Sequence, residues 1–144
     1  MRKASDRASV VAHELRVVLG QLTRRLRAQS GKGDLSLSQL AVLGMLDREG
    51  SATVTALARA EGVRSQSMGA TVAALQEAGL VDGAADPADG RQVMLSLTDA
   101  ARDLIKANRV AREDWLSQAI RSHLTSAEQQ ELAAAVDLLR RIVD

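Results

Sequence analysis

The stretch "VDGAADPADGRQVMLSLTDAAR", residues 81–102, decides how this chain can fold. In its second half Val93, Leu95 and Leu97 alternate with Gln92, Met94 and Ser96, which is the period of a half-buried β-strand. The short segment "LVDGA" precedes it, and "ADPADGR" lies between the two. Pro87 presets φ and Gly90 can adopt a positive φ, so this middle segment has the chemistry of a turn. The pattern predicts a β-hairpin with a long polar tip.

The rest of the composition favours helices. The 144 residues suffice for one domain with a real core. There is no Phe, no Tyr and a single Trp115, so Leu, Val, Ile, Met and Ala must fill that core. Apart from Val and Ile these residues favour helix. We therefore expect a mostly α-helical fold.

Apolar residues at spacings of three and four predict an amphipathic helix over about 8–28. The segment "SGKGD" at 30–34 supplies glycines suited to its C-cap. Ser36 and Gln39 have the spacing of a capping box and open a second helix, which Gly50 closes.

Two short helices follow. Thr53 can cap "VTALARAEG", which ends at Gly62, and "RSQSMGATVAALQEAG" begins after a tight turn. Such a pair is the helix-turn-helix arrangement, although a helical bundle produces the same spacing by chance. A hairpin placed directly after the second helix favours a winged helix-turn-helix over residues 36–98.

Two longer helices are expected over residues 99–144. Thr98 and Asp99 can cap the first, and Thr125 with Glu128 forms a capping box for the second. The last helix carries a single apolar stripe: Leu132, Val136, Leu139 and Val143.

This order of elements resembles the MarR family of bacterial transcriptional regulators over nearly the whole chain. The wing segment "DPADGRQVMLSLTDAAR" resembles the family's D-x-R motif followed by a strand, with Asp89 and Arg91 in the motif positions. "LARAEGVRSQSMGATVAALQEAGLV" resembles the family's paired helices. The motif is fairly specific only because it follows a helix-turn-helix.

The resemblance implies a single MarR-like domain, 1–144, that acts as a homodimeric repressor on a pseudo-palindromic operator in double-stranded DNA. Helices 8–28 and 99–144 would hold the dimer, and their apolar stripes suit a symmetric interface. Many relatives respond to a small organic effector. Trp115, Met45 and Arg16 are candidates for an effector pocket, and core packing is the alternative for the first two.

The expected DNA-binding residues lie in two places. The first turn of a recognition helix enters the major groove, where Gln can bond adenine and Arg can bond guanine. The small residues one turn later leave room for close approach. By resemblance Arg91 enters the minor groove from the wing, and Asp89 orients it through a charge-assisted hydrogen bond. The full set is Arg64, Ser65, Gln66, Ser67, Gly69, Ala70, Thr71, Asp89 and Arg91.

The sequence also departs from the family. Ala70, Ala74, Asp82 and Gly90 stand where relatives often carry bases, and Arg64 takes the usual cap position, which leaves Ser65 as the alternative cap. Residues 51–98 carry three bases against five acids, a balance of −2, whereas residues 1–33 have a balance of +6. Because DNA affinity depends on phosphate neutralisation, the alternative function is a winged-helix module that acts through protein contacts. Arg24, Arg25, Arg27 and Lys32 could compensate for the acidic segment.

Other classes of function find little support in the sequence. There is no cysteine, and His13 and His123 lack the spacing of a zinc motif, so no metal or cofactor is expected. Asp86 and Asp89 lie on a polar turn that would not raise a carboxylate pKa, and no catalytic residues are assigned. No apolar segment approaches membrane-spanning length, and we expect a soluble cytoplasmic protein that is not an enzyme.

Overall fold

The computed structural model describes residues 6–30 and 35–144. Within the chain two compact units are distinguished: a central unit, residues 32–107, and a terminal unit made of residues 1–31 and 108–144. Gly31, Lys32 and Gly33, which belong to the expected end of the first helix, lie outside the described residues.

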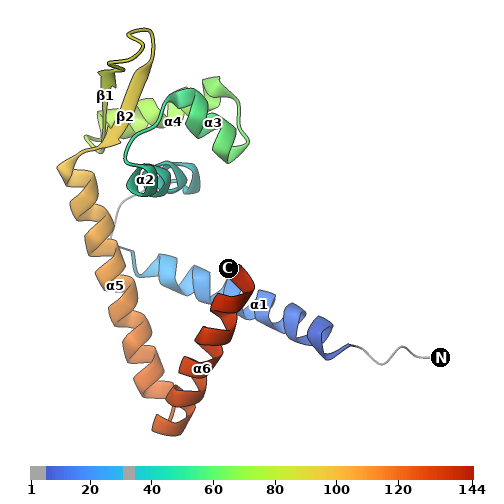
Figure 1. Cartoon of the computed structure of the whole chain (residues 1–144). Coiled ribbons are helices and arrows are strands. Elements are labelled where there is room, and N and C mark those ends of the chain that lie inside the picture. The colour runs from blue at the N-terminus through green and yellow to red at the C-terminus, as the bar shows by residue number, and fades with distance from the viewer. Residues whose placement is uncertain (1–5, 31–34) are drawn as a thin grey trace. The chain divides into compact units, whose positions relative to one another are not determined.

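The central unit contains three complete helices, a hairpin and the first part of the long helix that follows (Figure 1). The helices are α2 (Leu37–Glu49), α3 (Val54–Glu61) and α4 (Ser65–Glu77), followed by strands β1 (Val81–Ala85) and β2 (Val93–Leu97). The predicted capping box opens α2, because Ser36 and Gln39 each accept the other's backbone N–H. The mostly helical winged helix-turn-helix expected from the sequence is therefore confirmed.

The turn between α3 and α4 depends on the glycine at position 62. Gly62 adopts the left-handed conformation, with φ of 65°, and the next N–H, of Val63, donates to the carbonyl of Ala58 at 3.0 Å. These are the features of a glycine-terminated helix end. The second helix can therefore begin after only two further residues, at Ser65.

The wing is a pair of antiparallel strands in which Val81 lies opposite Leu97 and Ala85 lies opposite Val93. Leu95 and Leu97 are buried as expected, but Val93 is 49% exposed, because it lies at the end of the hairpin beyond the core. Gly90 does not adopt a positive φ, so that expectation is wrong. The tip is shaped instead by its aspartates.

One pairing had no signal in the sequence. Ala52, in the loop before α3, exchanges backbone hydrogen bonds with Leu95, with N···O distances of 3.0 and 2.8 Å. A single paired residue has no period that could reveal it. The bridge attaches the hairpin to the loop that precedes the helix-turn-helix.

The core of the central unit is wholly aliphatic. Its buried members come from every element of the unit: Val42, Leu43, Leu46, Ala52, Leu57, Ala58, Met68, Val72, Leu75, Val81, Leu95, Leu97 and Ala101. Two hydrogen bonds of Thr98 connect the helix that contains Ala101 to the rest of the unit. The Thr98 hydroxyl donates to the carbonyl of Gly79 at 2.7 Å and accepts the N–H of Ala101 at 3.1 Å, so it joins the end of the helix-turn-helix to the start of α5 (Asp99–His123).

The terminal unit contains α1 (Arg7–Ala28), the second half of α5 and α6 (Ser126–Val143). The guanidinium of Arg112 donates to the hydroxyl of Ser30 at 2.8 Å and ties α5 to the end of α1. Neither α1 nor α6 has a buried residue. Their apolar side chains are largely exposed: Val10, Val11, Val17, Val18 and Leu19 on α1, and Leu132, Val136, Leu138, Ile142 and Val143 on α6.

None of the helices in residues 6–30 and 35–144 combines the length and apolar character needed to span a bilayer.

Candidate nucleic-acid interface

The second helix of the helix-turn-helix, α4, buries one face and presents the other. Met68, Val72 and Leu75 recur at spacings of four and three and are at most 3% exposed. Because these residues fix the rotation of the helix, the opposite side faces outward. Gln66 and Ala70 lie on this outward side and are exposed, Ser65 is exposed in the first turn, and Gly69 is half-buried.

The N-terminus of α4 has no side-chain cap. Arg64 occupies the cap position in an extended conformation and makes no capping hydrogen bond, and Ser65 is already the first helical residue. Ser65 therefore does not replace it as the cap. In the described part of the chain every other helix start is capped by Asp6, Ser36, Thr53, Thr98 or Thr125. The first-turn N–H groups of α4 remain available for an anion such as a DNA phosphate.

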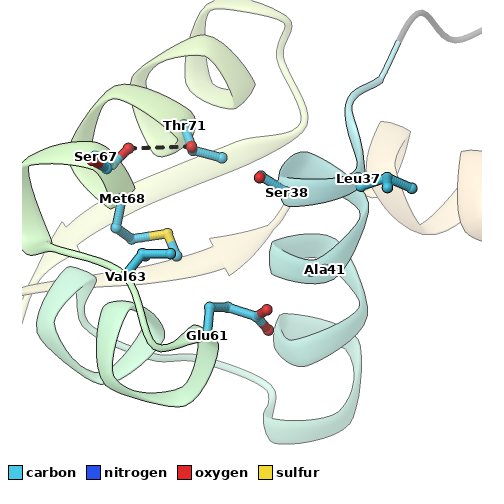
Figure 2. Close-up of a pocket in the computed structure, with 8 residues that line it drawn as sticks. All are labelled: Leu37, Ser38, Ala41, Glu61, Val63, Ser67, Met68 and Thr71. Atoms are coloured by element: carbon cyan, nitrogen blue, oxygen red, sulfur yellow. Dashed lines mark hydrogen bonds between the residues drawn. The ribbon is translucent and has the colours of Figure 1, made fainter.

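Ser67 and Thr71 lie on the side of α4 that faces α2 (Figure 2). The Thr71 hydroxyl donates to the carbonyl of Ser67 at 3.2 Å, one turn earlier in the same helix. Both residues line a groove of about 370 Å³ together with Ser38 of α2. Thr71 is half-buried, whereas Ser67 is exposed.

Two aspartates shape the tip of the wing. The Asp86 carboxylate accepts the N–H of Ala88 at 2.9 Å, and the Asp89 carboxylate accepts the N–H of Arg91 at 3.1 Å. Both are aspartate turns, in which a side chain bonds the backbone two residues on. The N–H of Asp86 donates to the carbonyl of Gln92 at 2.9 Å and closes the loop. The tip is thus ordered by local hydrogen bonds.

The expected contact between the Asp89 carboxylate and the Arg91 guanidinium is absent. Asp89 holds the backbone of Arg91 instead, because an aspartate turn brings the carboxylate to the N–H two residues later. The ion pairs among the described residues are Arg102–Asp99 and Arg140–Asp137, both exposed and local. The guanidinium groups of Arg64 and Arg91 are therefore available to a partner.

A glycine sets how closely the wing approaches α4. A Cβ on Gly83 would lie 2.9 Å from Cγ1 of Val93 and 3.2 Å from Nε2 of Gln76, near the end of α4. Sequence reasoning assigned no role to Gly83 or Gln76. An isolated glycine inside a strand is the signal that could have found them, since it often marks a close approach of another group.

The remaining predicted residues lie elsewhere. Arg24 and Arg25 line a polar surface hollow on α1 with Gln21, and Arg16 and Trp115 also belong to the terminal unit. Met45 packs against the core of the central unit, which is the alternative foreseen for it. No group of three metal-ligating side chains is found in the described ranges.

Comparison with known proteins agrees with the winged helix-turn-helix architecture. A model of the MarR family matches residues 33–92. The chain is 39% identical to an uncharacterised HTH-type transcriptional regulator of Mycobacterium bovis, over 96% of both chains. It is 36% identical to a transcriptional regulator protein of Pseudomonas aeruginosa of known crystal structure, with a TM-score of 0.85 over 97% of this chain and 98% of that one.

A more distant structure shares the fold. The regulator BpsR of Bordetella bronchiseptica is 24% identical, with a TM-score of 0.59 over 100% of this chain and 98% of that one. The DNA binding of BpsR is regulated by 6-hydroxynicotinic acid.

Proposed function

Because the chain belongs to the MarR family of transcriptional regulators, we propose that it is a homodimeric repressor that binds a pseudo-palindromic operator and is released by a small organic effector. The observation that carries the proposal is the exposed, uncapped start of α4 beside a wing that presents Arg91.

Recognition in the major groove is assigned to the start of α4. Gln66 can bond adenine through both the oxygen and the nitrogen of its side-chain amide, and Arg64 can bond guanine in a similar bidentate manner. The free N–H groups of the first turn, with the hydroxyls of Ser65 and Ser67, suit a backbone phosphate. Gly69 and Ala70, which follow in the next turn, allow the helix to approach the bases closely.

Recognition in the minor groove is assigned to Arg91. A guanidinium suits a narrow groove with strong negative potential. The aspartate turn at Asp89 supports this role by ordering the backbone from which the guanidinium projects. Asp89 itself would carry its negative charge toward the DNA, so its contribution is to the shape of the tip.

The homodimer is supported by the apolar faces of α1 and α6. Both helices expose aliphatic side chains that nothing in the described chain buries. The same surface on a second copy would cover them symmetrically. Two recognition helices related in this way would enter successive major grooves about 34–36 Å apart.

Release by an effector is supported by regulation of this kind in BpsR, which shares the fold. A ligand that changes the separation of the two recognition helices would lower affinity for an operator of fixed spacing.

A second function, a winged-helix module that acts through protein contacts, is favoured by the −2 balance of residues 51–98. The two functions differ in their dependence on salt. A protein that neutralises several phosphates loses DNA affinity steeply as salt rises.

The test is fluorescence anisotropy with DNA from upstream of the protein's own coding sequence, a scrambled duplex and a series of salt concentrations. We expect selective binding that weakens steeply with salt. Arg91→Ala should lose about 1–3 kcal/mol of binding free energy, the value of a good groove contact. Equal binding of both duplexes would favour the protein-contact module, whereas an Arg91→Ala variant that binds as tightly as the parent would show that Arg91 is not part of the DNA interface.

A further inference from the structure

The groove between α2 and the helix-turn-helix has features that the DNA-binding role leaves unexplained. Its volume of about 370 Å³ falls at the lower end of the range of small-molecule sites, about 300–1,000 Å³. Its lining comes from α2, the end of α3, the connecting turn and α4: Leu37, Ser38, Ala41, Glu61, Val63, Ser67, Met68 and Thr71.

Exposed apolar side chains of the central unit gather at this groove. Among the described residues of that unit, the exposed large apolar side chains are Leu37, Val63 and Val93. Leu37 is 61% exposed and Val63 is 45% exposed, and both line the groove. The groove therefore offers apolar contact at two exposed positions.

Glu61 is the single charged residue of the lining. Figure 2 shows its carboxylate extending from the end of α3 toward α2. It forms no ion pair among the described residues, although Arg59 and Arg64 are close to it in the sequence. A carboxylate in the last turn of a helix is also electrostatically unfavourable for that helix, so helix stability does not account for it.

We infer that this groove binds a small organic cation with an aliphatic body, of the alkylammonium class. Glu61 supplies the complementary charge, and Leu37, Val63 and Met68 supply apolar contact. The Ser38 and Ser67 hydroxyls add acceptor oxygens, whereas the Thr71 hydroxyl is already bonded within α4. An aliphatic body is favoured because the lining contains no aromatic side chain on which a ring could stack.

Occupancy of the groove would reach the recognition helix directly. Ser67 and Thr71 belong to α4, so a bound cation would contact the helix that we assign to the major groove. This consequence rests on the proposed function, whereas binding of the cation does not. We expect the cation to weaken operator binding about fivefold or more, as is typical of allosteric coupling.

The test is a titration of the ¹⁵N-labelled protein, without DNA, with hexyltrimethylammonium, with hexanol and with hexanoate at equal ionic strength. We expect amide shifts at Leu37, Val63 and Ser67, and binding of the cation about three- to tenfold tighter than that of the anion. Glu61→Gln should weaken cation binding about two- to fivefold, the effect of one exposed charge. Glu49→Gln, an exposed position at the end of α2 outside the groove, is the matched control and should change nothing.

A second variant tests whether a loss of probe binding could instead be caused by a loss of folding. Ala41→Leu fills the groove from α2 and should prevent binding of all three probes while the melting curve stays cooperative. Equal affinity for cation and anion, no effect of Glu61→Gln, or shifts at other amides would overturn the inference. Shifts at the groove that depend on protein concentration alone would identify a second copy as the occupant and would overturn it too. Because no DNA is present, these outcomes are independent of the test of operator binding.

Discussion

The carboxylate of Asp89 accepts a hydrogen bond from the backbone N–H of Arg91, with 3.1 Å between Oδ1 and N. The guanidinium of Arg91 takes no part in this contact. The pair that the sequence suggests as an ion pair is thus a turn, and the acidic residue sets the path of the backbone. This difference changes what substitutions at Asp89 should do.

We predict that Asp89→Asn binds the operator at least as tightly as the parent, whereas Asp89→Ala binds more weakly. Asparagine forms the same turn and removes a negative charge from a surface assigned to DNA, while alanine cannot form the turn at all. Anisotropy titrations of both variants at one salt concentration check this. If the two variants lost affinity equally, the charge of Asp89 would be what matters, and the turn would not be its main contribution.

We predict that Arg64→Ser stabilises the fold and weakens operator binding. A serine at the N-cap would satisfy a first-turn N–H of α4 and add about 0.5–1 kcal/mol to the free energy of unfolding. The same change removes a guanidinium assigned to guanine or phosphate. Urea unfolding and anisotropy on the same preparation measure the two effects. Unchanged DNA binding would remove Arg64 from the interface, and unchanged stability would mean that the cap does not form.

We predict that Gly83→Ala costs no more than about 1 kcal/mol in the free energy of unfolding, below the usual cost of overpacking a buried core, because Val93 and Gln76 are exposed side chains that can turn aside. Its Cβ would lie 2.9 Å from Val93 and 3.2 Å from Gln76, which must move apart. Gly90→Ala is the matched control, because its Cβ would have no heavy atom within 4 Å and its φ is not left-handed. The control should unfold like the parent. A Gly83→Ala protein destabilised well beyond this would show that Val93 and Gln76 cannot turn aside and that the wing packs tightly against α4.

The helices of this fold could be predicted because each carries its own local signal. The capping boxes at Ser36 and Thr125 and the glycine at position 62 set helix boundaries through contacts three to five residues apart. The apolar positions Met68, Val72 and Leu75 fix the buried face of α4 in the same local way. The helix boundaries and the buried face of α4 can therefore be predicted without knowing which distant residues they contact.

Two kinds of feature could not be predicted from the sequence. The first are contacts between segments distant in the sequence, and the second is which of several donors a carboxylate accepts a hydrogen bond from. The bridge from Ala52 to Leu95 and the approach of Gly83 to Gln76 exist only once the hairpin has folded onto the helices. At Asp89 the spacing was right, but spacing does not say whether the carboxylate meets the backbone or the side chain of Arg91. The assignment of the DNA-binding residues stays a prediction.

We predict that the start of α6 becomes less stable in acid because of Glu128. The backbone N–H of Thr125 donates to the Glu128 carboxylate at 2.8 Å, and this bond, with the Thr125 side chain, holds the pKa of Glu128 below its ordinary value of 4.5. A lowered folded-state pKa means that the stabilisation is present above pH 4.5 and is lost as pH falls through the folded-state pKa. Glu128→Gln keeps the capping box without the titration.

The measurement is urea unfolding of both proteins at pH 6 and at pH 3. The parent should lose more stability between these values than Glu128→Gln does. An NMR titration of the Glu128 carboxyl gives the pKa directly, and a value at or above the ordinary one would contradict the capping role.

We predict that Leu138→Lys with Ile142→Lys dissociates the homodimer. The two side chains are 57% and 74% exposed, one turn apart on α6, so the changes cost the folded chain little by themselves. Each side chain buried at an interface contributes about 1.5–3 kcal/mol, and a symmetric dimer loses both copies. Gln130→Lys, an exposed polar position on the same helix, is the control and should leave the dimer intact. Sedimentation velocity at micromolar concentration measures the mass, and circular dichroism verifies the helices. A double variant that still sediments as a dimer would place the interface away from this end of α6. A monomer that also loses operator binding would show that the two half-sites of the operator are bound by the two protomers of a symmetric dimer.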